Sequence, residues 1–201
     1  RHAGMFLGTQ EASQLLTRAA LDLPDVVKET LRSLPLARVA EVFRRLVEED
    51  IAIRNMRAIL ETLSDAAQRE KDVNALVELT RIGLKRQTCH RIAPDGQLRA
   101  VLLEPALEEA LRGALRVNGG VEQLALDPGQ ITQLMAYLKT MIEQLQPAAL
   151  VTAVDIRRHV RKLVETDCFA TPVLSYHELV PSLQLDVLAR LGGEGAPRLA
   201  G

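Results

Sequence analysis

Residues 93–105, with the sequence APDGQLRAVLLEP, decide how this chain folds, because two different patterns meet there. A proline followed by an Asp-Gly pair is typical of a turn. The apolar run 98–103 that comes next is typical of a buried strand. Helical periodicity precedes this stretch, and strands alternate with helices after it. The sequence therefore predicts an α+β fold, with a helical-bundle subdomain over residues 23–96 and a small α/β sandwich subdomain over residues 97–191.

The helical part is predicted from apolar residues that recur at positions i, i+3, i+4 and i+7. Pro24 suits the first turn of a helix, Pro35 ends the helix before it, and Asp72 is suited to cap a helix start. Phe43 is predicted to lie in the core. The helices are expected near residues 10–20, 24–34, 36–49, 56–63 and 73–82. The first of these helices lies within residues 1–22.

The second part is predicted to hold a small sheet with helices on at least one face. Strands are expected at 98–103, 149–152, 172–175 and 184–188, and helices at 105–115, 128–145 and 155–166. Asn118-Gly119-Gly120 is predicted as a loop. The glycine-rich residues 192–201 are predicted to be disordered.

Composition excludes several classes of function. The chain has 201 residues, a net charge of −1 and 2% aromatic residues, which argues against a nucleic-acid partner. Its longest apolar run, residues 148–154, is too short to span a bilayer. Two cysteines in a chain of this length indicate a reducing compartment rather than a disulfide framework. Because the chain begins with Arg1 and lacks a signal peptide, we expect it to be a fragment of a longer protein.

The adjacent residues Cys89 and His90 are the first candidates for chemistry. Neighbouring residues on a helix point about 100° apart, so this thiol and imidazole are poorly placed to act as nucleophile and base. A buried structural thiol is the preferred interpretation, and a cysteine-dependent enzyme is the alternative. Gly119-Gly120 lacks the rest of a phosphate-binding motif. We therefore predict no enzyme activity, no metal site and no cofactor.

Residues 155–162 (DIRRHVRK) form the densest basic run. The run is predicted to be the solvated face of an amphipathic helix, and a binding site for a phosphate or an acidic partner is the alternative.

A mixed-charge strip on the helices at 36–49 and 56–63, and on the link between them, is the candidate interaction site. Its members are Arg38, Glu41, Arg44, Arg45, Glu48, Arg54, Arg57 and Glu61. Glu41 and Arg45, like Arg57 and Glu61, are spaced i, i+4 and can simply stabilise their own helices. Alternatively, the strip meets a complementary strip on a neighbouring copy, a head-to-tail contact that can close into a ring.

Several motifs together resemble the export-gate proteins of type III secretion, the FHIPEP family shared by flagella and virulence injectisomes. The motifs are RHAGMFLGTQEA at 1–12, LPLARV at 34–39, LVEE at 46–49, IAIRNMRAILETL at 51–63, REKD at 69–72, LKRQTCH at 84–90 and VLSYHEL at 173–179. The Lys-Arg-x-x-Cys-His pattern is closer to the injectisome branch than to the flagellar one. The resemblance extends to about residue 191.

The resemblance implies a parent protein of the bacterial inner membrane, with a transmembrane N-terminal half and a cytosolic half of four subdomains that assembles as a nine-membered ring. This chain would lie on the cytoplasmic side and hold the end of the first subdomain, the third and the fourth. The implied partners are further copies of itself, secretion chaperones with exported substrates, and other export-apparatus and ATPase-complex components. The resemblance implies no catalysis. It also strengthens the charged strip as a subunit interface, while a generic helical adaptor without a ring is the alternative function.

Overall fold

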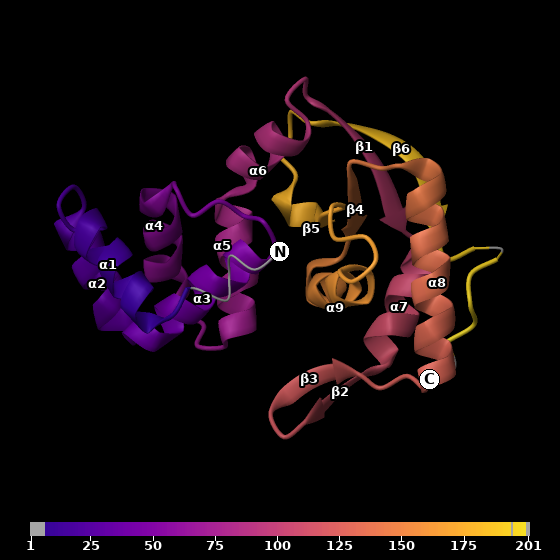
Figure 1. Cartoon of the computed structure of the whole chain (residues 1–201), viewed down its shortest axis with the longest axis horizontal. Coiled ribbons are helices and arrows are strands. Elements are labelled where there is room, and N and C mark those ends of the chain that lie inside the picture. The colour runs from indigo at the N-terminus through magenta and orange to yellow at the C-terminus, as the bar shows by residue number, and fades with distance from the viewer. Residues whose placement is uncertain (1–6, 194, 200–201) are drawn as a thin grey trace. The chain divides into compact units, whose positions relative to one another are not determined.

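The computed structural model describes residues 7–193 and 195–199. The chain divides into two compact units, Arg1–Thr88 and Cys89–Gly201, which are described separately (Figure 1). The boundary between them falls inside one short helix, α6 (Lys85–Ile92).

The described part of the first unit is helical. Its helices are α1 (Thr9–Ala19), α2 (Pro24–Ser33), α3 (Leu36–Glu48), α4 (Met56–Ala66) and α5 (Val73–Gly83). Local chemistry sets their starts. Pro24 is the first residue of α2, and Pro35 precedes α3. Asp72 caps α5 by accepting a hydrogen bond from the Ala75 amide at 2.9 Å, which confirms the predicted cap.

One aliphatic core joins these helices. Phe43 of α3 is fully buried, as predicted, and packs in the same cluster as Leu60 of α4 and Leu76 of α5. Ala12 and Leu16 of α1 belong to this cluster too. Helix α1 therefore packs with α2–α5. The assignment of residues 1–22 to a preceding subdomain, like the other subdomain boundaries, remains a prediction.

The second unit has the predicted α+β architecture. Its elements are β1 (Gln97–Leu103), α7 (Pro105–Gly113), β2 (Leu115–Asn118), β3 (Val121–Leu124), α8 (Pro128–Leu145), β4 (Ala149–Thr152), α9 (Val154–Val164), β5 (Val173–Ser175) and β6 (Gln184–Leu191), with a 3₁₀ turn at Tyr176–Glu178. Within the described residues, β5, β4, β1 and β6 form a sheet in that order, and each neighbouring pair is parallel.

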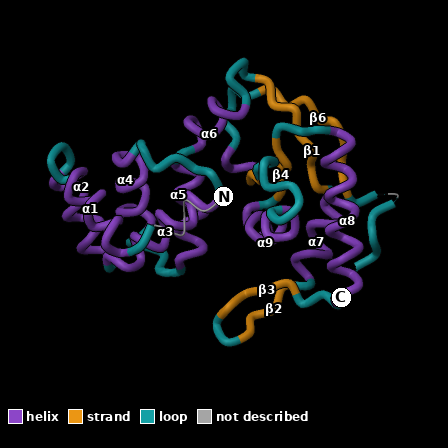
Figure 2. The backbone as a smooth tube through the Cα atoms, viewed as in Figure 1, coloured by secondary structure: helices purple, strands orange, loops and turns teal. Residues whose placement is uncertain are grey.

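Each face of this sheet has its own apolar cluster. On one face, Leu98 and Ala100 of β1 pack with Val151 of β4. On the other, Val101 and Leu103 of β1 pack in a cluster that includes residues of α7, α8 and α9. Figure 2 shows β4, β1 and β6 beside α8 and α9. Strands with helical crossovers are normally buried on both faces, and β1 and β4 follow that rule.

The prediction of a plain loop at residues 118–120 missed a β-hairpin. Gly119 and Gly120 join β2 to β3, with φ angles of +58° and +79°. Two successive positive φ angles are the signature of a type I′ turn, whose twist matches that of the two strands.

Two predictions concern residues that are not fully described. Half of the motif at 1–12 precedes residue 7, and positions 194, 200 and 201 of the predicted disordered tail are outside the described residues. The prediction about the tail is therefore untested.

Candidate subunit interface on the helical unit

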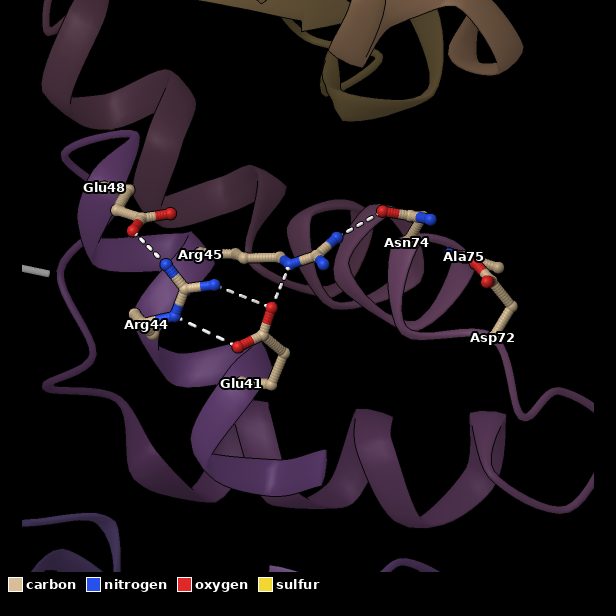
Figure 3. A network of polar contacts seen from close by, with 7 residues as sticks. All are labelled: Glu41, Arg44, Arg45, Glu48, Asp72, Asn74 and Ala75. Carbon is tan, nitrogen blue, oxygen red and sulfur yellow. Dashed lines mark hydrogen bonds and ion pairs between the residues drawn. The ribbon is translucent and has the colours of Figure 1, made fainter. Parts of the chain in front are cut away.

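Glu41 is the centre of the charged cluster on α3. Its carboxylate accepts two hydrogen bonds from Arg44, at 3.0 and 2.7 Å, and one from Arg45 Nε at 2.7 Å (Figure 3). Arg44 also pairs with Glu48 one turn further along. The predicted i, i+4 pair between Glu41 and Arg45 is therefore confirmed, and four predicted interface residues form one network.

This network also connects α3 to the start of α5. Arg45 donates a hydrogen bond to the amide oxygen of Asn74, the second residue of α5 (Figure 3). Arg38 donates to the carbonyl oxygen of Lys71 at 3.2 Å, just before the α5 cap. Charged side chains that bridge two elements in this way lose more freedom than isolated surface residues, so the cluster presents a fixed arrangement of charges.

The charges in the cluster are already balanced within the chain. The hydrogen bonds from Arg44, followed by those from Arg45, lower the pKa of Glu41, although partial burial opposes the shift. The pKa of Arg44 is raised, chiefly by its hydrogen bonds to Glu41. The side chains are 29–41% exposed, so each ion pair contributes only about 0–1 kcal/mol to folding. The cluster therefore contributes little to the stability of the fold.

The structure separates the remaining candidates from this cluster. Arg57 and Glu61 of α4 pair with each other at 3.3 Å, as predicted from their spacing, and both are more than half exposed. Glu61 borders a shallow hollow between α2 and α4, of about 420 Å³, together with Asp25, Glu29 and Asp65. Arg54 is exposed on the link before α4. The predicted strip thus contains two ion-paired groups, one on α3 and one on α4 (the α4 patch, with Arg54), and its role in subunit contact stays a prediction.

The α5 side of the cluster also contains a buried ion pair that the sequence did not reveal. Arg81 of α5 is 2% exposed, and its Nη1 lies 2.8 Å from a carboxylate oxygen of Glu49, directly after α3. Burying such a pair is favourable only where geometry and further hydrogen bonds offset desolvation. Its spacing of 32 residues leaves no local signal in the sequence.

Cys89 and His90 do not form a reactive pair. The Cys89 thiol is buried and donates a hydrogen bond to the carbonyl oxygen of Glu178 at 3.2 Å, whereas His90 is exposed. The structural interpretation of this thiol is confirmed.

The interpretation of residues 155–162 as a solvated face was wrong for three of its basic residues. Arg157, His159 and Arg161 are at most 4% exposed. Arg157 donates to the Val173 carbonyl at 3.2 Å, and Arg161 donates to the Phe169 and Thr171 carbonyls at 3.2 and 3.1 Å. These side chains hold the α9–β5 loop and the start of β5, so they are not available to a phosphate.

Arg158 and His159 of α9 hold the hairpin, whereas Lys162 is exposed. Arg158 and His159 Nε2 both donate to one oxygen of Glu122 on β3, at 2.5 and 3.1 Å. Hydrogen bonds from His159 and Arg158 lower the pKa of Glu122, while burial lowers the pKa of His159. Arg158 and His159 thus have a structural role within the chain.

Within residues 7–193 and 195–199, no group of three or more histidine, cysteine, aspartate or glutamate side chains is arranged to hold a metal ion. None of the helices in this part of the chain combines the length and the apolar character that crossing a membrane requires.

Comparison with known proteins identifies relatives of this chain. The model of the FHIPEP family matches residues 1–184. The chain is 38% identical over 195 residues to the Low calcium response locus protein D of Yersinia pestis, covering 94% of the chain and 28% of that protein. It is 35% identical to the Invasion protein InvA of Salmonella typhimurium, with the same coverage of both chains. The chain thus spans less than a third of the length of these relatives.

Solved structures agree with this relationship. The nonameric EPEC SctV-C structure superposes with a TM-score of 0.87 at 34% identity, over 94% of this chain and 59% of that one. The Chlamydia pneumoniae CdsV protein gives a TM-score of 0.84 at 38% identity, over 93% and 55% of the two chains. With a family match that covers most of its residues, the chain belongs to the FHIPEP family, the export-gate proteins of type III secretion.

Proposed function

We propose that this chain is the distal part of the cytosolic domain of a type III secretion export gate. It would act as a non-enzymatic scaffold that assembles into a nine-membered ring and docks chaperone–substrate complexes, below a parent protein anchored in the bacterial inner membrane. The observation that carries the proposal is the likeness to the nonameric EPEC SctV-C over 94% of the chain. The EscV cytosolic domain from the type III secretion system, also nonameric, gives a TM-score of 0.84.

The α3 cluster and the α4 patch are the proposed contact surfaces between subunits. A ring needs two different surfaces on each subunit, because each copy contacts one neighbour on either side. The separation of the strip into two patches suits that requirement. The charges around Glu41 have a fixed arrangement that a neighbouring copy can match in a head-to-tail contact. Arg54, Arg57 and Glu61 are exposed enough to form ion pairs with a neighbouring copy instead of within the chain.

Docking of chaperone–substrate complexes follows from the ring as a multivalent array. Copies of one weak site, held around a common axis, raise the effective concentration of each site for a bound partner. The structure of a complex between the Chlamydia pneumoniae CdsV and CdsO proteins, whose CdsV chain has a TM-score of 0.87 with this one, supports docking of other secretion components on such a domain.

The alternatives are less well supported. A cysteine-dependent enzyme would need an accessible thiolate, but Cys89 is buried and bonded to a backbone carbonyl. A generic helical adaptor does not account for the α/β second unit, whereas the likeness to the nonameric EPEC SctV-C covers 94% of this chain.

The proposed interface is tested by reversing the charge of Arg54 and Arg57 in the double variant Arg54→Glu/Arg57→Glu. We expect sedimentation velocity over a concentration series to show oligomers of up to nine copies for the wild-type chain, and association at least about tenfold weaker for the variant. The far-UV circular dichroism melt should be almost unchanged, because exposed ion pairs contribute little to folding.

A matched control carries the same change of charge on the second unit. Arg116→Glu/Lys162→Glu alters two exposed residues far along the chain from α4 and should sediment like the wild type. Equal sedimentation of the two double variants would remove the α4 patch from the interface. A wild-type chain that stays monomeric at every concentration would refute self-assembly through this chain.

Docking is tested separately with a purified type III secretion chaperone–substrate complex on a sensor surface. We expect the assembled chain to retain the complex longer than the monomeric variant does, because rebinding depends on neighbouring copies. Equal dissociation rates would refute multivalent docking while leaving the ring intact.

A further inference from the structure

The two edges of the parallel sheet differ in length and in exposure. At one edge, β5 has three residues, all buried. At the other, β6 has eight residues, and Gln184, Leu185, Asp186 and Val187 are all exposed. Short or covered edge strands are the usual protection against unwanted pairing. The edge formed by β5 has that protection, and the first half of β6 does not.

The backbone of β6 has one open side. The Gln184 amide donates to the Gly96 carbonyl at 2.9 Å, so its polar groups face β1. Successive residues of a strand direct these groups to alternate sides, so the amides and carbonyls of Leu185 and Val187 face the open edge. Among the described residues, β1 is the strand that pairs with β6. Groups arranged in this way are matched by an extended chain rather than by a helix.

The usual obstacles to such pairing are missing from this half of the strand. Residues 184–191 (QLDVLARL) contain no proline and no lysine, the residues that most often disrupt pairing at an edge. The β-bulge in β6 comes after Val187, where the register with β1 shifts between Ala100 and Val101. Residues 184–187 therefore remain regular and can accept a further strand.

The side chains indicate which sequence this edge would accept. Leu185 and Val187 lie beside Leu98 and Ala100 of β1 in the register, and those two residues are fully buried. Leu185 and Val187 continue the same apolar face but are 41% and 38% exposed. Apolar side chains on an added strand would cover them. Asp186, on the opposite face and also exposed, lies beside Arg99 of β1 in the register, and a basic residue on an added strand would lie on its other side.

Other occupants fit less well. The described residues of the first unit, 7–88, form helices and no strand, so they cannot extend the sheet. Two copies of β6 could pair antiparallel, but the register that sets Leu185 against Val187 places two Asp186 carboxylates opposite each other. Like charges in that position are destabilising.

We infer that the open edge of β6 binds an extended segment of an exported protein, which adds a strand beside residues 184–187 and presents alternating apolar and basic side chains. The inference rests on the proposed function for the source of the segment. Main-chain hydrogen bonds would supply affinity irrespective of detailed sequence, while Leu185, Val187 and Asp186 would supply a preference for the alternating pattern. Such an edge can receive many different unfolded segments, which suits a gate with many substrates.

The test uses this chain and a fluorescein-labelled peptide of strictly alternating valine and lysine. We expect saturable binding by fluorescence anisotropy, with shifts of the backbone amide signals of residues 184–187 in a ¹⁵N spectrum. A peptide of the same composition with its valines grouped together should bind at least about tenfold more weakly, because its apolar side chains cannot all lie on one face. A valine–glutamate peptide should also bind more weakly.

Two variants of the chain locate the site. Asp186→Lys reverses the one charge on the edge and should weaken binding of the valine–lysine peptide at least about tenfold. Val187→Pro removes an outward amide at an edge position where proline is tolerated, and should have a similar effect. Glu143→Lys, an equal change of charge on an exposed residue of α8, should bind like the wild type.

Equal affinity for the alternating and grouped peptides, or amide shifts confined to residues outside β6, would overturn the inference. So would self-association of the unliganded wild-type chain that the valine–lysine peptide reverses, because it would show that a second copy occupies the edge. Sedimentation of the unliganded chain reports ring assembly independently, so a failure of peptide binding is distinguishable from a failure of the proposed function.

Discussion

Replacing Phe43 by alanine tests whether the helical unit has its own core. The side chain is fully buried in the cluster that joins α3 to α4 and α5. Truncating a buried phenylalanine to alanine costs about 3–5 kcal/mol, through lost burial and the cavity that remains. A domain of ordinary stability, about 5–15 kcal/mol, would lose about a fifth or more of its free energy of unfolding. With an m-value of about 2 kcal/mol/M, the urea midpoint should fall by about 2 M.

The distribution of chromophores lets one experiment follow the two units separately. The chain has no tryptophan and two tyrosines, Tyr137 and Tyr176, both in the second unit. Tyrosine fluorescence therefore reports unfolding of the second unit, whereas far-UV circular dichroism reports helices of both. We expect Phe43→Ala to move the circular dichroism transition to lower urea and to leave the tyrosine transition in place.

Leu150→Ala is the reciprocal control. Leu150 is fully buried in β4, in the second unit, and its truncation should move the tyrosine transition by about 2–5 kcal/mol. If Phe43→Ala shifts both signals together, the units unfold as one cooperative body. If it shifts neither by as much as 1 kcal/mol, the packing assigned to Phe43 is incorrect.

Two smaller changes test particular contacts. A Cβ on Gly83 would lie 2.3 Å from Oγ1 of Thr62, so Gly83→Ala should destabilise the helical unit by about 1–3 kcal/mol; adding Thr62→Ala should restore part of the loss, and a purely additive double variant would contradict the clash. Burial lowers the pKa of His159 below its ordinary value of 6.5, so the unfolded chain binds more protons than the folded chain just below pH 6.5, and the second unit should lose stability as the pH falls through that region. His159→Gln should flatten this dependence in urea titrations followed by tyrosine fluorescence, and an unchanged slope would assign it to other groups.

Elements that are set by local chemistry could be predicted from the sequence. Pro24 and Asp72 mark helix starts and Pro35 marks the end of the helix before it, and the structure places these boundaries there. The hairpin was missed although Asn-Gly is a strong turn signal, because β2 and β3 are only four residues each. Over so few residues, alternation of apolar and polar side chains is too brief a pattern to mark a strand.

The burial of two arginines in α9 could not be predicted, because their hydrogen-bond partners lie outside the helix. The pattern of charges there is typical of an exposed helix face. Arg157 and Arg161 are instead buried because the loop that follows α9 offers them carbonyl oxygens at Phe169, Thr171 and Val173. Every residue type has a backbone carbonyl group, so side-chain identities do not indicate which residues will accept these hydrogen bonds.

In the candidate interface, too, only the contacts between residues close in sequence could be predicted. Spacing predicts the pairs Glu41–Arg45 and Arg57–Glu61, and both are present. The bond from Arg45 to Asn74 joins two helices across 29 residues and has no local signal. Which residues contact a neighbouring copy depends on a surface outside the chain, so that assignment remains a prediction.

The balanced charges around Glu41 have a consequence for the way subunits would come together. A side chain that is already neutralised exerts little long-range attraction, so approaching copies would meet by ordinary diffusion rather than by electrostatic steering. On contact, the charges around Glu41 would keep their partners within the chain, which leaves a small net electrostatic gain at any single junction. A closed assembly with such junctions would be stable because every copy has two neighbours. It would dissociate quickly once one copy is lost.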